Sequence, residues 1–435
     1  MKNIQTVTVV GATGTMGPNV AGIFASFGDA KVFCVGRNLE KVNKTIPRIV
    51  KSVRADSIEA NLIPADFSML ADCVSKSDLV FESLVENMDI KTRIANEIAK
   101  SLRKDAISCT GSSGLSITKL AECYPEELRK HFFGVHMFNP PYNMPLCELT
   151  PTCYSDKFVQ TELKEYLEKR LIRTVVEVKD SPAFLANRIG FQFINEAMQY
   201  AEKYKDNGGI DYVDAILGPF TGRSMAPLIT SDFVGLDIHK AIVDNLYKNT
   251  CDYANSTYVL PEFAERLIEN NKLGRKTGGG LYQRLKYDNG LKRQTVYDIN
   301  TGMYRDIIPY VFPFAEKMKR FFREGDYKDA FAELINNHSL EAEICLTFLL
   351  NYIVYSIYCE KEVGYSSESA DKVMAAGFHW CPPKALYGAL SESTCVPDLI
   401  RERLPQLYEK VDVDSLLADI KPSGYDFRPF FKTGI

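Results

Sequence analysis

The apolar residues in the first part of the chain come in short continuous runs, each followed by glycine or a polar turn and then by a helical period. Such runs predict buried strands, and we expect strands over residues 6–10, 31–35, 78–84, 106–109, 132–138 and 173–178. Helices are expected between them, over residues 19–27, 88–102 and 116–123. Strands that alternate with helices are typical of a doubly wound, mostly parallel sheet, so residues 1–180 are predicted to form an α/β domain.

After residue 180 the pattern changes to long helical periods. Residues 184–204 predict an amphipathic helix, and helical segments follow, so residues 181–283 are predicted to form an all-helical domain. Residues 284–306 then alternate like strands, with Asn289-Gly290 and Thr301-Gly302 as turn signals. This pattern predicts a β-rich linker.

Residues 307–435 are helical again and predict a second helical domain. The letters FLANRI at 184–189 are echoed by FLLNYI at 348–353, which indicates a tandem duplication of one helical fold. Tyr352 stands in the second copy where the first has Arg188, so we expect the second copy to have a structural or dimer-mimicking role. A chance match of so few letters is the alternative.

Composition narrows the class of protein. The chain is 46% hydrophobic and 25% charged with a net charge of -4. This charge balance lacks the excess of basic residues expected of a nucleic-acid-binding protein, so nucleic acid is not an expected partner. No apolar run approaches the roughly 18 to 20 residues needed to cross a bilayer, so no membrane contact is expected. The 11 cysteines are scattered without a C-x-x-C pair, which favours free thiols in a reducing cytoplasm over disulfides or a zinc site.

A glycine-rich turn follows the first predicted strand. Residues 11–17 read GATGTMG and lead into a predicted helix. Glycines in that context let backbone amides approach a pyrophosphate at a helix N-terminus. The spacing G-x-x-G-x-x-G is one residue longer in its first half than the usual motif. We therefore predict a dinucleotide site that includes Gly11, Gly14, Thr15, Met16 and Gly17.

The end of the second predicted strand bears on the choice of cofactor. An acid there would hydrogen-bond the ribose hydroxyls of NAD, but this chain has Gly36-Arg37. An arginine near that ribose can pair with a 2′-phosphate, which would favour NADP over NAD by roughly an order of magnitude. The alternative is that Arg37 points into water at the start of a helix. The cofactor is thus NAD or NADP, with NADP slightly favoured.

His136 lies in the apolar run at 132–138, at the mouth of a predicted strand. A histidine in such a place can take or give a proton near neutral pH. Glu148 lies in a second apolar run, where a lone carboxylate would be costly without a partner. A carboxylate that holds the other ring nitrogen of His136 would satisfy both groups. The alternative is a satisfied core histidine and an ordinary surface glutamate.

Together these segments resemble the 3-hydroxyacyl-CoA dehydrogenase family. The pieces that carry the resemblance are VVGATGTMG (9–17), LVFESLVENMDIK (79–91), SSGLSIT (112–118), GVHMFNPP (134–141), LCELT (146–150), DSPAFLANRI (180–189) and LGRKTGGGLY (273–282). They run in the family's order and at nearly its spacings through residues 1–285. The second helical region also looks like the duplicated C-terminal domain of longer members.

The resemblance implies a Rossmann-type domain followed by a helical dimerisation domain, and a reversible hydride transfer between NAD(P) and C3 of a 3-hydroxyacyl-CoA. In this chain the matching general base is His136, the acid that orients it is Glu148, and Ser113 and Asn187 would bind the substrate oxygen. The positions that match the nicotinamide side of the cofactor site are Glu86, Lys91, Asn139 and Lys276. No metal is implied.

The resemblance also implies partners. These are an acyl-CoA substrate and an enoyl-CoA hydratase. A duplicated helical domain could replace the contact by which shorter members dimerise, so a monomer or a homodimer is expected.

The sequence departs from the family in the glycine spacing, in Gly36-Arg37, and in a spacing from Ser113 to His136 that is two residues longer than usual. Two other functions therefore remain open. One is a reductase or dehydrogenase of a non-CoA 3-hydroxy or diketo compound, and the other is a non-catalytic nucleotide-binding subunit of a hydratase–dehydrogenase complex.

Overall fold

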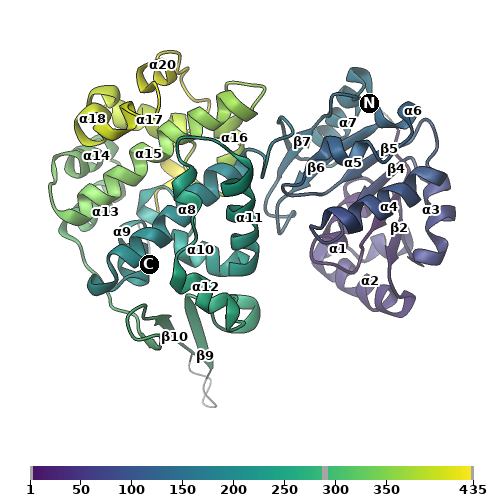
Figure 1. Ribbon diagram of the computed structural model, residues 1–435, viewed down its shortest axis with the longest axis horizontal. Helices are drawn as coiled ribbons and strands as arrows, with labels where there is room; N and C mark the ends of the chain where they lie inside the picture. Colours follow the sequence, from purple (N-terminus) through teal and green to yellow (C-terminus); the bar gives the residue numbers. More distant parts are fainter. Residues whose placement is uncertain (1–2, 287–291, 433–435) are drawn as a thin grey trace. The chain divides into compact units, whose positions relative to one another are not determined.

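The computed structural model describes residues 3–286 and 292–432. The chain divides into two compact units (Figure 1). The first comprises residues 1–184 and 363–377, and the second comprises residues 185–362 and 378–435. The first unit is built on a large sheet and the second is mainly helical.

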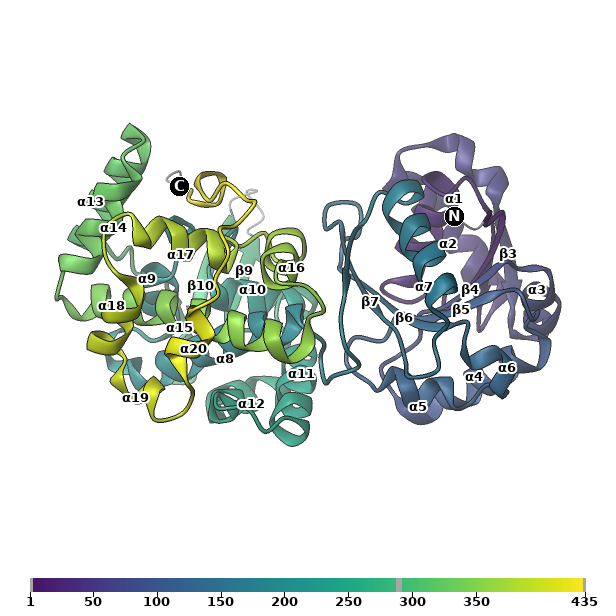
Figure 2. The same cartoon turned by 90° about the horizontal axis from the view of Figure 1, so that it is seen from above.

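The sheet of the first unit has eight strands in the order β3-β2-β1-β4-β5-β6-β7-β8. Strands β3 to β7 of this sheet are labelled in Figure 2. They are β1 (Thr6–Val10), β2 (Lys31–Gly36), β3 (Leu62–Asp66), β4 (Leu79–Glu82), β5 (Ile107–Thr110), β6 (Phe132–Met137), β7 (Leu146–Thr150) and β8 (Thr174–Glu177). Its helices are α1 (Gly17–Ser26), α2 (Leu39–Val53), α3 (Leu70–Lys76), α4 (Met88–Ser101), α5 (Ile117–Ala121), α6 (Glu126–Arg129), α7 (Lys157–Glu165) and α16 (Ser369–Gly377). Only the β6–β7 pair in this sheet is antiparallel, so the predicted doubly wound, mostly parallel fold is confirmed.

The strand order creates a switch point beside β1. The chain passes from β1 through β2 to β3 at one edge, and then returns to place β4 on the other side of β1. Because parallel crossovers are right-handed, helices α1 and α2 cover one face and α3 and α4 cover the other. The carboxyl ends of β1 and β4 therefore adjoin where the helices leave in opposite directions, which is where ligands bind in such sheets.

Strand β3 is not among the predicted strands. It reads LIPAD, is only partly buried, and has a proline opposite Cys34 of β2. Proline cannot donate to a ladder, so it weakens the local strand signal and is tolerated at an edge. The edge position of β3 explains both the proline and the missed prediction.

The opposite edge of the sheet is completed by residues from much later in the chain. Val178 pairs with Gly364, and the backbone N–H of Lys179 donates to the carbonyl of Val363 at 2.8 Å. Helix α16 then packs on β7 and β8. A Cβ on Gly377 would lie 2.4 Å from a methyl carbon of Leu146, so glycine permits this close approach.

The second unit contains helices α8 (Ala186–Lys203), α9 (Ile210–Ile216), α10 (Pro227–Val234), α11 (Leu236–Asn249), α12 (Glu262–Glu269), α13 (Pro313–Glu324), α14 (Tyr327–Asn336), α15 (Leu340–Val363), α17 (Pro383–Ser391), α18 (Val396–Arg403), α19 (Pro405–Tyr408) and α20 (Val413–Leu417). A small antiparallel sheet, β9 (Tyr282–Lys286), β10 (Lys292–Tyr297) and β11 (Tyr304–Asp306), covers the region of the predicted β-rich linker. The predicted Asn289-Gly290 turn lies outside the described residues.

Helix α15 is the longest apolar element of this unit. By length and composition it could cross a membrane, so the expectation that no apolar run approaches that length is wrong here. However, 78% of its most apolar stretch is buried inside the protein. The rings of Phe193 and Tyr200 from α8 lie 5.0 and 4.9 Å from the ring of Phe348 on α15. Packing of a core helix accounts for its apolar character.

Two loops of the second unit pair with each other around a buried arginine. The backbones of Arg223 and Trp380 form an isolated antiparallel β-bridge, and the N–H of Cys381 donates to the carbonyl of Gly222 at 2.7 Å. The Arg223 guanidinium lies 3.8 Å from the ring centre of Phe193 and 4.8 Å from that of Trp380. Burial lowers the pKa of Arg223 to about 10, and the aromatic faces stabilise the cation.

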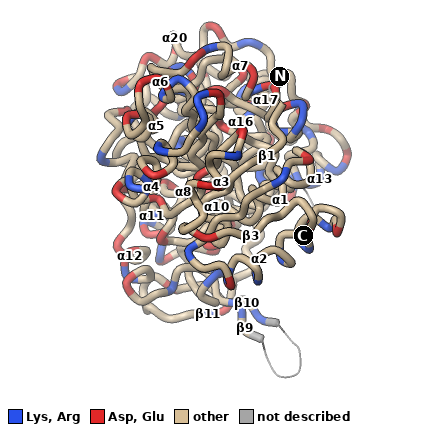
Figure 3. The backbone as a smooth tube through the Cα atoms, turned by 90° about the vertical axis from the view of Figure 1, so that its right-hand side faces the viewer, with Lys and Arg blue, Asp and Glu red and all other residues tan. Residues whose placement is uncertain are grey.

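Charged residues of both signs are interspersed along the described chain (Figure 3). Many form short-range pairs on helix surfaces, such as Lys44 with Glu40 and Lys76 with Asp72. Such exposed pairs contribute little to stability.

The buried His239 is held neutral by its partners. The amide nitrogen of Asn195 donates to the carbonyls of Thr257 and Val259, so its oxygen accepts from Nε2–H of His239 at 2.9 Å. The Nδ1 atom of His239 then accepts from the Ser231 hydroxyl at 3.1 Å. Burial lowers the pKa of His239 to about 3.

This low pKa predicts a pH-dependent stability of the second unit. Below about pH 6.5 the unfolded chain gains a proton on His239 that the folded chain does not, so the free energy of unfolding falls as pH falls toward 3. Between pH 7.5 and 5.5 we expect wild type to lose about 1.4 kcal/mol more than His239→Gln. The single tryptophan, Trp380, lies in the same unit, so urea unfolding followed by its fluorescence measures this. Equal losses in both proteins would contradict the prediction.

Candidate functional site

The antiparallel pairing of β6 and β7 places His136 directly opposite Glu148. The Nδ1 atom of His136 lies 2.8 Å from a carboxylate oxygen of Glu148, and their side chains are 9% and 0% exposed. Because a carboxylate only accepts, Nδ1 carries the hydrogen. The structure thus brings the two predicted residues together and leaves Nε2 of a neutral His136 with its lone pair free for a proton.

Aromatic rings surround this histidine. The ring centre of His136 lies 4.5 Å from that of Phe138 and 5.7 Å from that of Phe184. Phe184 and the preceding Ala183 both have positive φ, at 53° and 58°, and both are buried. Left-handed backbone is costly for such residues, so two strained positions place the Phe184 ring beside His136.

The loop after β5 is organised by Glu86. One carboxylate oxygen of Glu86 accepts from the hydroxyl of Ser112 at 2.6 Å and from the backbone N–H groups of Ser113 and Gly114, each at 2.9 Å. The neighbouring serine, Ser112, therefore uses its hydroxyl for structure. The hydroxyl of Ser113 forms no hydrogen bond to another described residue and stays available for a ligand.

Lys91 is buried beneath this loop. Its ammonium lies 2.9 and 3.0 Å from the two carboxylate oxygens of Glu82 and 3.6 Å from Glu86. The Thr110 hydroxyl donates to Glu82 at 2.6 Å. Glu82 is absent from the predicted site residues, although its signal resembles that of Glu148, a lone acid in the apolar strand LVFE. One buried cation thus links the ends of β4 and β5 to the Ser113 loop.

The glycine turn lies at the switch point of the sheet. Gly11 has φ 94°, and a Cβ there would lie 2.2 Å from the carbonyl oxygen of Ser83 after β4. A Cβ on Gly17 would lie 2.1 Å from the carbonyl oxygen of Gly11. Glycine is required at both positions. Gly14 and Thr15 are exposed and Met16 is half-buried, so this turn presents backbone at the start of α1, as a dinucleotide pyrophosphate needs.

Gly36 ends β2 against the same turn, because a Cβ there would meet Thr13 at 3.1 Å and Val42 at 2.6 Å. Asn38 caps α2 by accepting from the N–H of Lys41 at 3.0 Å. Between them Arg37 is exposed and forms no ion pair with any residue that the structure describes. Its guanidinium is therefore available to an anion at this end of β2.

The remaining predicted residues are spread over both units. In the first unit the exposed Asn139 accepts from the Asn19 amide of α1 at 3.4 Å. In the second unit Asn187 lies in the first turn of α8, is 6% exposed, and its amide makes no hydrogen bond to another described residue. Lys276, also in the second unit, forms an ion pair with Asp237.

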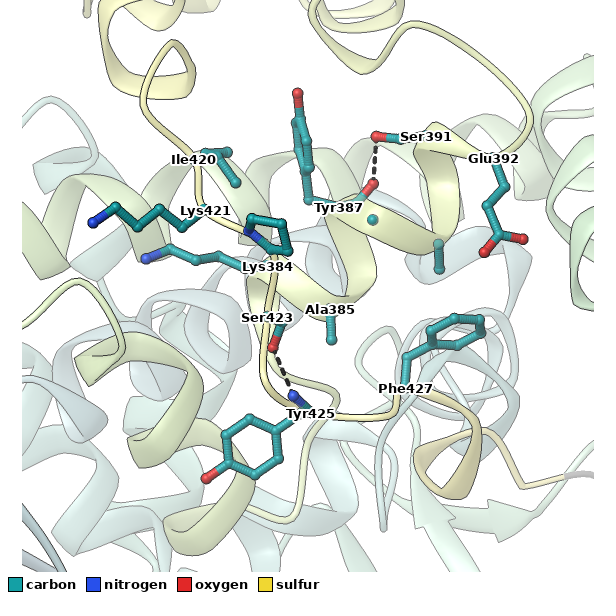
Figure 4. A pocket seen from close by; sticks show the side chains of 13 residues that line it. Lys384, Ala385, Tyr387, Ser391, Glu392, Ile420, Lys421, Ser423, Tyr425 and Phe427 are labelled. Atoms are coloured by element: carbon teal, nitrogen blue, oxygen red, sulfur yellow. Dashed lines mark hydrogen bonds between the residues drawn. The ribbon is translucent and has the colours of Figure 1, made fainter.

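A separate cavity of about 360 Å³ lies in the second unit between α17 and residues 420–427 (Figure 4). Lys384 lines it, but its ammonium is paired with the buried Glu360. None of the predicted site residues lines this cavity. Within the described part of the chain, no group of three or more His, Cys, Asp or Glu residues could hold a metal ion.

Two domains of one known family match this chain, one in each unit. Residues 6–181 match the NAD binding domain of 3-hydroxyacyl-CoA dehydrogenase, and residues 184–284 match its C-terminal domain. The matched regions contain the glycine turn, the His136–Glu148 pair and Asn187.

Individual relatives agree. A Deinococcus radiodurans protein named a probable 3-hydroxyacyl-CoA dehydrogenase is 32% identical over 298 residues, which is 65% of this chain and 84% of the relative. A Bacillus subtilis protein of the same name is 26% identical over 345 residues, which is 79% of this chain. This chain spans only 42% of that longer relative.

The fold similarity extends beyond residue 285. The crystal structure of 3-hydroxybutyryl-CoA dehydrogenase from Escherichia coli matches with a TM-score of 0.68 and 20% identity, and covers 94% of this chain and 96% of its own. At that identity the match concerns the fold alone. On the domain matches and the Deinococcus relative together, the chain belongs to the 3-hydroxyacyl-CoA dehydrogenase family.

Proposed function

We propose that this protein is a 3-hydroxyacyl-CoA dehydrogenase that interconverts a 3-hydroxyacyl-CoA and a 3-ketoacyl-CoA with a nicotinamide dinucleotide. The observation that carries the proposal is the His136–Glu148 pair, with Nδ1 held at 2.8 Å and Nε2 unengaged. Such a histidine is suited to one proton transfer at a hydroxyl oxygen. The family to which the chain belongs supports the substrate class.

In the oxidation, Nε2 of His136 takes the proton of the substrate's 3-hydroxyl group. The positive charge that then forms on the ring is stabilised by Glu148, which is fully buried and 2.8 Å away. In the reduction, the charged ring returns the proton to the same oxygen. Glu148 thus fixes the tautomer and orients the ring.

Ser113 and Asn187 supply hydrogen-bond donors for the substrate oxygen in this proposal. Each has a polar group that no other described residue engages, whereas Ser112 uses its hydroxyl on Glu86. Donors aimed at developing negative charge on an oxygen are commonly worth about 3 to 4 kcal/mol of transition-state stabilisation.

The glycine turn between β1 and α1 would hold the cofactor pyrophosphate, and Arg37 would face the adenosine ribose. A bound nicotinamide supplies the hydride acceptor or donor for C3. The buried Lys91 acts indirectly, because it fixes Glu86 and through it the backbone of Ser113.

The first test removes the proposed base. We expect His136→Gln to lower kcat about 10²- to 10⁴-fold for NADH- or NADPH-dependent reduction of acetoacetyl-CoA, since that range is typical of general acid–base catalysis. Absorbance at 340 nm measures the rate, and calorimetry should show unchanged cofactor binding.

The matched control is His131→Gln. His131 is half-buried, lies just before β6, and its Nδ1 contacts the carbonyl of Ala106. It should keep near-wild-type activity. Equal activity of both variants would overturn the role of His136. If wild type does not turn over acetoacetyl-CoA but does turn over free 3-keto acids or diketones, the substrate is a non-CoA compound and not a CoA thioester.

We also propose that Arg37 pairs with the 2′-phosphate of NADP. A charge-assisted hydrogen bond at an exposed site predicts that Arg37→Ala raises KM for NADPH about 10-fold and leaves KM for NADH nearly unchanged. Arg48→Ala, which removes another exposed arginine of the same region on α2, is the control and should affect neither. A wild-type preference for NADH would refute the role given to Arg37 and would leave the proposed dehydrogenase activity unaffected.

A further inference from the structure

The first turn of α8 is anchored by a buried polar network in the second unit. Arg188 follows Asn187 directly, and its side chain is 6% exposed. Its Nη2 and Nε atoms donate to one carboxylate oxygen of Asp252 at 3.0 and 3.2 Å. The other carboxylate oxygen of Asp252 accepts from the N–H of Ala254 at 3.0 Å. Arg188 is therefore tied to the chain between α11 and α12.

A tyrosine of α15 completes this network. The hydroxyl of Tyr355 donates to the same oxygen of Asp252 that Arg188 contacts, at 2.8 Å. Because the Tyr355 hydrogen goes to Asp252, the single hydroxyl hydrogen of Tyr258 is shared between the Tyr355 oxygen and the backbone carbonyl of Arg188, which lies 3.3 Å away. All four side chains are buried. The side chain and the backbone of Arg188 are thus both held by groups that meet at Tyr355.

We infer that Tyr355 is a positioning residue on α15 that holds the first turn of α8 and thereby places the Asn187 amide for the substrate. This inference rests on the proposed function for the role of Asn187. Buried networks are rigid when every member is satisfied, and loss of one hydroxyl leaves the rest incompletely paired. Small displacements of a positioning group can cost up to about 10²-fold in rate.

The chain provides a matched comparison on the same helix. Tyr352 lies one turn earlier on α15, is equally buried, and donates its hydroxyl to the carbonyl of Cys381 at 2.8 Å. This carbonyl acceptor is not one of the groups described above around Arg188. Tyr352→Phe and Tyr355→Phe each remove one buried tyrosine hydroxyl. The Tyr352 hydroxyl donates to the Cys381 carbonyl, whereas the Tyr355 hydroxyl donates to Asp252, the partner of Arg188.

The kinetic experiment compares these two variants with wild type in the reduction of acetoacetyl-CoA. We expect Tyr355→Phe to lower kcat about 10-fold, with KM for the cofactor within twofold, because the glycine turn lies in the other unit. We expect Tyr352→Phe to leave kcat near wild type. Equal losses of kcat in both variants, or no loss in Tyr355→Phe, would overturn the inference.

Hydrogen exchange followed by mass spectrometry separates this inference from the proposed function. Faster exchange in peptides that cover residues 186–190 is expected in Tyr355→Phe and not in Tyr352→Phe. If wild type shows no turnover, the proposed function fails and the exchange result alone decides whether Tyr355 anchors α8. If Trp380 fluorescence shows that Tyr355→Phe is unfolded, Tyr258→Phe replaces it, with the same expected direction. Unchanged exchange in these peptides would refute the anchor.

Discussion

The pairing of β7 antiparallel to β6 is the constraint on which the candidate site depends. Opposite residues of an antiparallel pair point to the same face, so the register that matches His136 with Glu148 also fixes their contact. A slip of one residue would turn Glu148 to the other face of the sheet and leave a buried carboxylate without its partner. The same pairing therefore aligns the proposed base and relieves the cost of burying Glu148.

Buried carboxylates with several partners recur wherever a loop or helix end must be held. Glu82 engages Lys91 and Thr110 below the Ser113 loop, and Asp252 engages Arg188 and Tyr355 at the start of α8. Removal of one partner from such a group is costly because the charge stays buried. The proposed substrate-binding side chains, Ser113 and Asn187, are not members of these buried charged groups. Their positions are set by residues that are unavailable to a ligand.

Local sequence patterns were sufficient for most strands of the large sheet, but not for β7, which carries Glu148 and was predicted only as an apolar run, and not for long-range contacts. The apolar runs predicted β1, β2, β4, β5, β6 and β8 because buried parallel strands are continuous and apolar. Strand β3 was missed because Pro64 interrupts an edge strand. The burial cost of Glu148 led to His136, yet the same reasoning was not applied to Glu82. The link from Asp252 to Tyr355 spans 103 positions, and no local pattern encodes it.

The return of residues 363–377 to the first unit has a consequence for synthesis of the chain. Strand β8 and the packing surface of β7, which carries Glu148, are completed by Val363, Gly364 and helix α16. A domain that emerges from the ribosome first usually folds first. Here the β8 edge of the sheet cannot be completed until most of the second unit has been translated. The nascent first unit therefore passes through a stage with an uncovered edge, when it is most exposed to mispairing and to chaperones.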